Sequence, residues 1–251
     1  MAAASLLKLI APTSLLLAWE FLVPYLFGTG LFLLPIPSAV ISHLLDMGRD
    51  GTLTRHFGIT LWRVLVCVVV GGGLGAAIGV LMGISRFANY MLDGLFSFIH
   101  PIPKIAVFPL FLIVFGYGET ARVVLIGLSA FFPMLIAGRT AAQAIDPRLV
   151  EVCQNYGIGG WLWLRRFILP SCMPVLLSGL RISITTAFIV TIAVEMLGSE
   201  AGVGSLLWLG WQTLQMAEIF GLLFLIGVTG LLVNSVITSV EARYLRGRHE
   251  T

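Results

Sequence analysis

Residues 151–170, EVCQNYGIGGWLWLRRFILP, form a polar and basic segment in an otherwise strongly apolar chain. Asp146-Pro147 comes shortly before it, and this pair is typical of a helix start because Asp caps the first backbone N–H groups and Pro needs none. A long apolar run begins after Leu169-Pro170. A structured, charged loop between two apolar runs suits contact with a soluble partner. An amphipathic loop that only lies on a bilayer explains the composition equally well.

The spacing within this loop predicts two short helices. Gly157 stands where a helix from residue 147 should stop, since glycine readily takes the left-handed conformation. Leu149, Cys153 and Tyr156 then share one helical face. A second helix through the Arg165-Arg166 pair is expected to end before Pro170. The sequence thus predicts a helix–glycine–helix loop over residues 140–172.

Other residues offer little for catalysis. The four histidines are scattered along the chain, and the sequence contains no H-E-x-x-H, G-x-S-x-G or C-x-x-C pattern. We therefore expect no catalytic residue, no metal site and no cofactor held by this chain. The three cysteines, Cys67, Cys153 and Cys172, are an odd set and imply no disulfide framework.

The apolar run after the loop carries polar residues that could line a transport path. Ser178, Arg181, Thr185 and Glu195 fall within about a 100° arc of a helix. Ionisable groups inside a membrane span usually face protein or water. Arg181 is expected near the cytoplasmic mouth and Glu195 near the external gate. The alternative is that Arg181 reaches toward headgroups and Glu195 pairs with a neighbouring helix.

The elements that position these residues are membrane helices. The chain of 251 residues is 58% hydrophobic and 11% charged, with a mean hydropathy of +1.01. Apolar runs long enough to cross roughly 30 Å of hydrocarbon recur. We predict an all-α, polytopic membrane protein with a single transmembrane domain over residues 1–251 and about six spans, near 9–27, 60–84, 102–116, 121–139, 173–197 and 219–240.

The basic residues indicate an orientation. Six spans with both termini inside place most Lys and Arg in the cytoplasm, in agreement with the positive-inside rule. These are Lys8, Arg86, Lys104, Arg139, Arg148, Arg165, Arg166, Arg243, Arg246 and Arg248, whereas Arg49, Arg55, Arg63 and Arg122 would lie outside. The sequence pI near 9.0 then reflects topology, and no nucleic-acid partner is expected.

One span carries a repeat of small residues. Gly71, Gly75, Gly79 and Gly83 recur every four residues, which lets another helix backbone approach closely. We expect these glycines to pack helices. The repeat does not tell whether the neighbour belongs to the same subunit or to a second copy.

The 151–170 loop resembles the EAA motif of ABC-importer permeases: E-A-A, three residues, Gly, nine residues, I-x-L-P. Glu151, Gly157 and Leu169-Pro170 match at that spacing. Val152 and Cys153 replace the alanines and Phe167 replaces isoleucine, which bears on the fine fit to a partner. The segments LLPIPSAV, HPIPKIAVFPLFLIVFGYGETARVVLI and GLRISITTAFIVTIAVEMLGSEAGVGSLL are similar to the taurine, alkanesulfonate and nitrate branch.

This resemblance implies the type I (MetI-like) permease fold and the pore subunit of an ATP-driven importer in a bacterial inner membrane. The coupling residues would be Arg148, Leu149, Glu151, Val152, Cys153, Tyr156, Gly157, Leu169 and Pro170. The implied partners are a cytoplasmic ATPase dimer that binds ATP-Mg, an external binding protein, a second permease copy and membrane lipids. Lys8 and Lys104 are the only lysines, and neither stands in a Walker A motif.

The branch favours a small anionic solute, with sulfonate or taurine ahead of nitrate or bicarbonate. Import of a vitamin or vitamin precursor is one alternative. A secondary transporter or channel that works without an ATPase is another, although the chain shows no inverted repeat.

Overall fold

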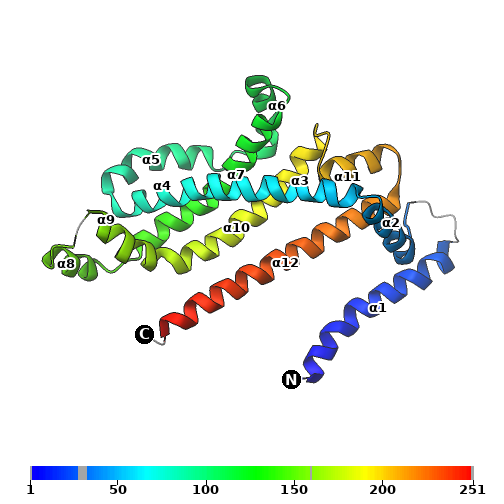
Figure 1. Ribbon diagram of the computed structural model, residues 1–251, viewed down its shortest axis with the longest axis horizontal. Helices are drawn as coiled ribbons and strands as arrows, with labels where there is room; N and C mark the ends of the chain where they lie inside the picture. Colours follow the sequence, from blue (N-terminus) through cyan, green and yellow to red (C-terminus); the bar gives the residue numbers. More distant parts are fainter. Residues whose placement is uncertain (1, 28–32, 159, 250–251) are drawn as a thin grey trace. The chain divides into compact units, whose positions relative to one another are not determined.

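The computed structural model describes residues 2–27, 33–158 and 160–249, with side chains for 14–26, 33–153, 155–158 and 160–243. No strand occurs in these ranges, which confirms the all-α prediction. The helices are α1 (Ala2–Phe27), α2 (Pro37–Arg49), α3 (Thr52–Cys67), the π-helix η1 (Val68–Gly72), α4 (Gly73–Ile84), α5 (Arg86–Ile99), α6 (Lys104–Phe115), α7 (Glu119–Gln143), α8 (Pro147–Asn155), α9 (Gly160–Trp163), the π-helix η2 (Leu164–Ile168), α10 (Leu169–Met196), α11 (Val203–Gln212) and α12 (Met216–His249) (Figure 1). The side chains of Lys8, Arg246 and Arg248, which enter the predicted orientation, lie outside the described ones.

Four helical segments of the described chain are long and apolar enough to cross a membrane: Thr52–Ile84, Glu119–Gln143, Gly160–Met196 and Met216–Arg243. A fifth crossing arises if α5 and α6 count as one bent span. Of α1, the part with described side chains, Ser14–Leu26, is a shorter apolar helix. Among the described residues, four or five spans are thus found by length and composition, and the predicted first span near 9–27 lies only partly within them.

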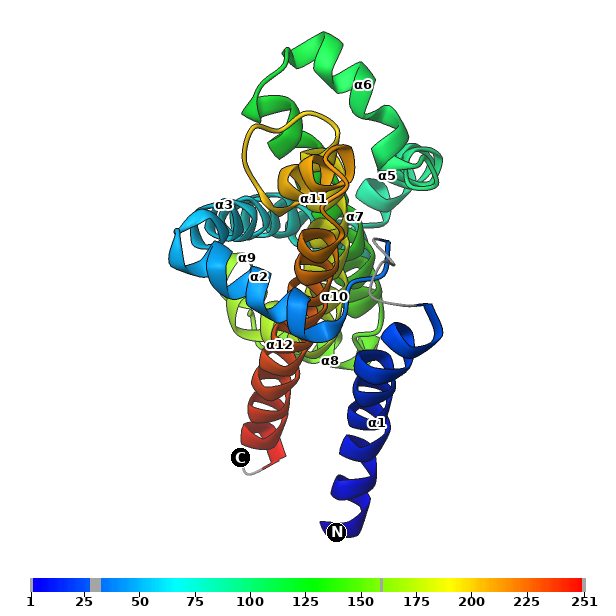
Figure 2. The same cartoon turned by 90° about the vertical axis from the view of Figure 1, so that its right-hand side faces the viewer.

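The third predicted span, near 102–116, corresponds to α6, which covers Lys104–Phe115. This helix qualifies as a possible crossing only together with α5, from which a bend of 97° separates it. Figure 2 shows the two helices on either side of the bend. The prolines of the HPIPK segment explain the bend, because proline cannot continue the backbone ladder and disfavours helix in the residue before it. At the bend, the ammonium of Lys104 donates to the His100 carbonyl at 2.5 Å.

The helices form two compact units, one of residues 1–59 and 195–229 and the other of residues 60–194 and 230–251. Helices α3, α10 and α12 each contribute to both. A single permease domain over 1–251 stays a prediction.

Close packing of α4 on α7 organises the larger unit. A Cβ atom added to Gly71, Gly75 or Gly79 would collide with backbone atoms of α7 in the same chain, and one added to Gly83 would collide with Ala142. The neighbour of the glycine repeat is therefore α7 (Figure 1). Small residues allow this approach, and the many contacts between the two backbones supply its dispersion energy.

Two apolar clusters fill the same unit. One gathers side chains of α3, α6, α7 and α10, including the buried Phe108 and Leu125. The other joins α4 and α7 to η2 and α10 through Val80, Ile168 and Cys172, with Trp163 packed against it. The second cluster connects the loop after α8 to the helix bundle.

In the smaller unit, polar contacts fix the helix ends. Glu20 of α1 accepts from the backbone N–H and the hydroxyl of Ser38 at 3.0 and 2.7 Å. Before α3, the Asp50 carboxylate accepts from the Thr52 N–H at 2.9 Å. That bond favours the charged carboxylate and holds the pKa of Asp50 below its ordinary value.

Candidate functional site

Helix α8 begins and ends as the sequence predicts. The Asp146 carboxylate accepts from the Arg148 N–H at 2.9 Å, which is an N-cap bond. At the other end Gly157 has φ of +69°, and the Ile158 N–H donates to the Cys153 carbonyl at 2.9 Å. This six-to-one bond around a left-handed glycine is a Schellman C-cap. Both caps predicted for α8 are confirmed.

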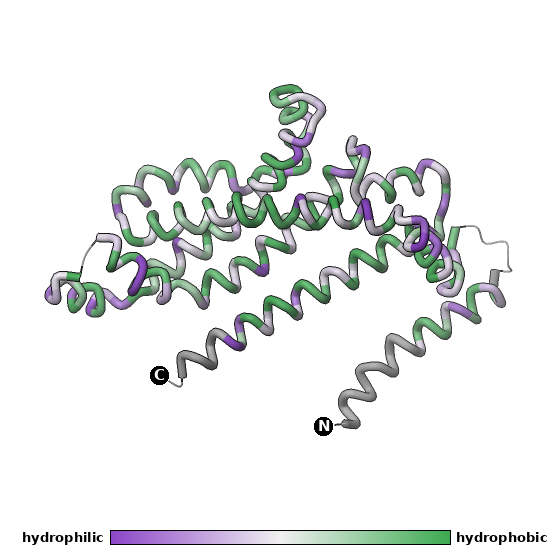
Figure 3. Tube along the Cα trace, viewed as in Figure 1, coloured by the Kyte–Doolittle hydropathy of each residue, from purple (hydrophilic) through white to green (hydrophobic). Residues whose placement is uncertain are grey.

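The two faces of α8 have different surroundings. Leu149, Val152 and Tyr156 lie on one face and are 52%, 49% and 80% exposed. On the opposite face Val150 and Glu151 line a cavity shared with the helix bundle. Hydropathy along α8 accordingly alternates, whereas α4 is apolar over most of its length (Figure 3). The outward face of α8 is therefore both apolar and exposed.

The second helix of the loop does not end before Pro170, and that prediction is wrong. Helix α9 continues through η2 into α10. Proline has no N–H to donate to the carbonyl four residues earlier, and its ring crowds that carbonyl. The chain responds by widening to a π-turn, in which the Leu169 N–H bonds the Leu164 carbonyl. From Gly160 onward the chain therefore runs into the α10 span as one continuous helical segment, Gly160–Met196.

The four polar residues predicted on α10 lie in different surroundings. Arg181 donates to the Glu241 carboxylate of α12 at 2.6 Å and to Thr238 at 3.1 Å, and Ser178 donates to the same carboxylate at 3.0 Å. Thr185 bonds the Arg181 carbonyl of its own helix at 2.9 Å. Ser178 and Arg181 thus share one ion-pair cluster.

Glu195 belongs to a different site in the other unit. It is 1% exposed and accepts from the Gly204 N–H, at the start of α11, at 2.9 Å. A Cβ on Gly202 would collide with this carboxylate, and the Gly202 N–H also donates to His56 Nδ1 at 3.2 Å. A carboxylate at a helix N-terminus is favourable because it satisfies free N–H groups.

An ion cluster of two buried arginines and one exposed carboxylate in α3 and α7 was not predicted from the sequence. Arg63 makes two bonds with the Glu119 carboxylate, at 2.6 and 3.0 Å, and Arg122 makes one at 3.0 Å. Both arginines are less than a tenth exposed, although the sequence predicts them among the external charges. The i,i+3 spacing of Glu119 and Arg122 could have predicted their ion pair from the sequence. The ion pair of Glu119 with Arg63 could not have been predicted, because the two residues are distant in sequence.

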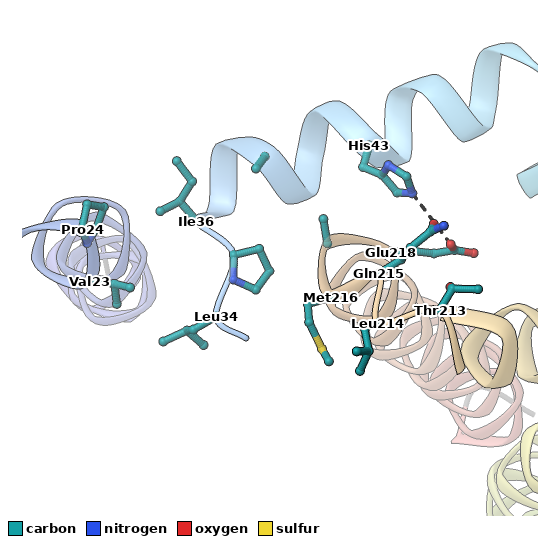
Figure 4. A pocket seen from close by; sticks show the side chains of 13 residues that line it. Val23, Pro24, Leu34, Ile36, His43, Thr213, Leu214, Gln215, Met216 and Glu218 are labelled. Carbon is teal, nitrogen blue, oxygen red and sulfur yellow. Dashed lines mark ion pairs between the residues drawn. The ribbon is translucent and has the colours of Figure 1, made fainter. Parts of the chain in front are cut away.

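A pocket of about 560 Å³ lies within the smaller unit, between the end of α1, α2 and the start of α12 (Figure 4). His43 Nε2 and Glu218 Oε2 approach to 3.9 Å across it. Its other labelled walls are mainly apolar, including Leu34, Ile36 and Met216. Neither this pocket nor any other described group combines three metal-ligating side chains.

The chain resembles known membrane permeases. The model of the family described as "Binding-protein-dependent transport system inner membrane component" matches residues 70–248. The putative aliphatic sulfonates transport permease protein SsuC of Bacillus subtilis is 29% identical over 96% of this chain and 87% of its own length. A putative ABC transporter permease of Methanocaldococcus jannaschii is 30% identical over 95% and 90%. The taurine transport system permease protein TauC of Escherichia coli is 26% identical over 84% and 78%.

Among solved structures, the MetNI methionine ABC transporter in inward facing conformations has a chain that aligns with a TM-score of 0.62. The alignment covers 75% of this protein and 96% of that chain at 19% identity, which shows the fold. The predicted MetI-like fold is thereby confirmed. In this family the ATPase activity belongs to a separate partner of the membrane subunit. The chain belongs to the binding-protein-dependent transport system inner membrane component family, as an ABC-importer permease of the sulfonate, taurine and nitrate branch.

Proposed function

We propose that this protein forms the pore of an importer for a small anionic solute, with organosulfonates such as taurine as the first candidates. The substrate class rests on what the names of the relatives say they transport. Nitrate is the next candidate on the same ground. The importer lies in the bacterial inner membrane with both termini in the cytoplasm, an orientation supported by the distribution of Lys and Arg.

The observation that carries the transport mechanism is α8, a helix capped at both ends that presents an apolar face to solvent. Leu149, Val152 and Tyr156 form this face, with the half-buried Cys153 among them. An exposed apolar stripe at i, i+3 and i+7 is the pattern by which a helix enters a groove on a partner. We assign the groove to the cytoplasmic ATPase dimer, which binds ATP-Mg.

The remaining residues of the EAA-like motif lie on the other side of α8 or in the segment that follows it. Glu151 and Val150 look toward the helix bundle, and Gly157 sets the turn after α8. Leu169 caps the π-helix η2, and Pro170 follows it in the first turn of α10. Movement of the ATPase would pass from α8 across the Gly157 turn to α9, which is continuous with η2 and α10.

In the pore, Arg181 is the cation we assign to the path of the anion. It is paired with Glu241 and Ser178, and Thr185 lies one turn further along α10. Pairing with Glu241 stabilises the charged guanidinium of Arg181 within the span. A passing anion can replace the Glu241 carboxylate as the partner of that guanidinium. Glu195 instead anchors α11, and its effect on transport is expected to be structural.

The assembly includes further partners. We infer a second copy of this permease, because one chain offers one α8 to an ATPase dimer. An external binding protein delivers the substrate. Lipids cover the many apolar side chains exposed on the spans, such as Leu231 and Ile113.

Reconstitution tests this function directly. The permease is incorporated into proteoliposomes with its ATPase and binding protein, and uptake of labelled taurine, a linear alkanesulfonate and nitrate is measured with and without ATP. We expect sulfonate uptake only with all three components and ATP. Uptake by the permease alone would overturn the importer mechanism in favour of a secondary transporter or channel, and uptake of a vitamin precursor alone would overturn the substrate class.

A further inference from the structure

The pocket of about 560 Å³ in the smaller unit has a polar end and an apolar end. Figure 4 shows His43 and Glu218 together at one end, and Val23 and Pro24 of α1 at the other. The volume is in the range of small-molecule sites. The walls between the two ends include four apolar side chains, Leu34, Ile36, Leu214 and Met216. A linear molecule with a polar head and an apolar chain matches this order of walls.

Glu218 is the buried member of the polar end. Its side chain is 8% exposed, and its ionic contact among the described residues is with His43, whose Nε2 lies 3.9 Å from Oε2. That distance is too long for a hydrogen bond. The carboxylate oxygens keep accessible surface, so a molecule in the pocket can reach them. A buried carboxylate is costly without a bound donor or cation, and this end of the pocket therefore calls for one.

The turn between α11 and α12 holds a leucine in a conformation that favours glycine. Leu214 has φ of +58°, the only positive value for a non-glycine residue in the described chain. The Gln215 N–H donates to the Gly210 carbonyl at 2.8 Å, and the Leu214 N–H donates to the Trp211 carbonyl at 3.3 Å. This is a Schellman cap, in which glycine usually takes the left-handed position.

Such backbone strain persists where the rest of the molecule requires the residue that carries it. Leu214 lines the pocket and is 48% exposed. What leucine supplies here, and glycine would not, is an apolar wall between the polar end and α1. The strained turn and the buried carboxylate thus point independently to a ligand with an apolar chain and a donor head.

We propose that this pocket binds an aliphatic primary ammonium ion, with its head between Glu218 and His43 and its chain along Leu214 and Ile36. An ammonium has three N–H donors and no acceptor. It can therefore donate to the Glu218 carboxylate and to the unprotonated ring nitrogen of a neutral His43. Because the carboxylate repels anions, this is not a site for the anionic solute of the proposed function.

Two sources carry this chemistry. One is a free alkylamine, and the other is a lysine side chain of the external binding protein, whose apolar stem ends in the same ammonium group. Binding of a free amine does not depend on the proposed function. The lysine source rests on it, because it needs a binding protein that docks at this end of the permease.

The test uses the permease–ATPase complex in phosphatidylcholine nanodiscs, titrated calorimetrically, with empty nanodiscs to subtract partition into lipid. Hexylammonium is the probe. Methylammonium lacks its chain, 1-hexanol lacks its charge and hexanoate reverses that charge. We expect hexylammonium to bind tighter than each analogue by roughly tenfold or more.

Glu218→Gln keeps the shape of the side chain and removes its charge, so it should weaken hexylammonium binding by roughly tenfold or more. Glu200→Gln is the matched control, because Glu200 is an exposed carboxylate of the same unit that does not line the pocket. It should bind hexylammonium as the wild type does.

Leu214→Gly separates a wall of the pocket from a structural leucine. Glycine relieves the left-handed strain, so the variant should melt no lower than the wild type while binding hexylammonium about threefold or more weakly. A lower melting temperature with unchanged binding would show that the leucine serves the fold, and would overturn its assignment to the ligand.

Repetition with saturating binding protein separates the sources. Loss of hexylammonium binding indicates that a lysine of the binding protein enters the pocket, and unchanged binding indicates a free amine. No binding beyond that of empty nanodiscs, equal binding of 1-hexanol, or unchanged binding by Glu218→Gln would overturn the proposal and leave water as the occupant. Failure of uptake in the reconstitution described above would leave the titration without binding protein unaffected, so the two proposals can fail independently.

Discussion

Glu151 and Tyr156 belong to the same short helix and face opposite ways. Tyr156 is 80% exposed on the outward face, and Glu151, also exposed, lines the cavity on the other side of α8. Under the proposed function, the EAA-like motif combines residues that would contact the ATPase with residues next to the helix bundle. The spacing of the motif groups the two kinds of residue together. Spacing gives the positions of residues along the chain, but it does not show which side of α8 packs against the helix bundle.

Replacement of Tyr156 by Ala tests the exposed face. Central aromatic residues of an interface contribute about 2 kcal/mol or more, so the mutant complex with the ATPase should be roughly 30-fold weaker. Affinity for the ATPase in nanodiscs is the measurement. Asn155→Ala changes an exposed polar residue at the edge of this face and should leave that affinity within twofold of wild type, and an equal loss in both variants would refute the assignment.

The Arg181–Glu241 ion pair allows a test of the pore. Removing one member leaves a partly buried charge without its partner, which should lower the free energy of unfolding by about 1–3 kcal/mol in either Arg181→Gln or Glu241→Gln. The exchanged pair, Arg181→Glu with Glu241→Arg, should recover part of that stability in thermal melts. If Arg181 also binds the anion, sulfonate uptake stays low in the exchanged variant even where stability returns.

At the scale of elements, the sequence predicted what depends on local signals. Asp146 and Gly157 mark the two ends of α8 that the structure contains. The π-turn before Pro170 was not predicted. A helix can accommodate a proline by widening to a π-turn, and here that depends on how α9 packs against the apolar cluster that contains Ile168. Partners such as Arg63 with Glu119 and Arg181 with Glu241 are distant in sequence and follow only from the tertiary fold.

The α4–α7 contact gives a prediction with a control in the same helix. Gly75→Ala places a Cβ against the backbone of Phe131, so the two helices must separate, at a cost of about 1–3 kcal/mol. Gly73→Ala meets no atom within 4 Å and should change stability by less than about 0.5 kcal/mol. Thermal melting in detergent compares the two, and equal effects would show that the close approach is not what stabilises this pair.

The turn after α8 gives a second prediction for an element. Gly157→Ala forces an L-residue into a left-handed conformation, at a cost of roughly 1–2 kcal/mol. No atom lies within 4 Å of the added Cβ, so the cost is conformational. We expect lower ATP-driven uptake and a melting temperature lowered by about 2–8 °C. Gly94→Ala, where the glycine lies in α5 with open space around it, should keep wild-type uptake and melting.

For the whole molecule, the structure describes a helical path from an exposed face to the polar residues of a membrane span. The face is on α8, the path runs through α9 and η2, and the polar residues are Ser178 and Arg181 on α10. The family match places the ATPase on a separate chain, so energy has to enter where a partner can bind. The central claim is that it enters through the outward face of α8.

Photo-crosslinking from α8 tests this claim most directly. A benzoylphenylalanine is placed at Val152, on the exposed face, or at Val150, which lines the cavity, and the permease–ATPase complex is irradiated. We predict a crosslink to the ATPase from position 152 and crosslinks only within the permease from position 150. Equal crosslinking to the ATPase from both positions, or none from position 152 in a complex that transports, would contradict the account.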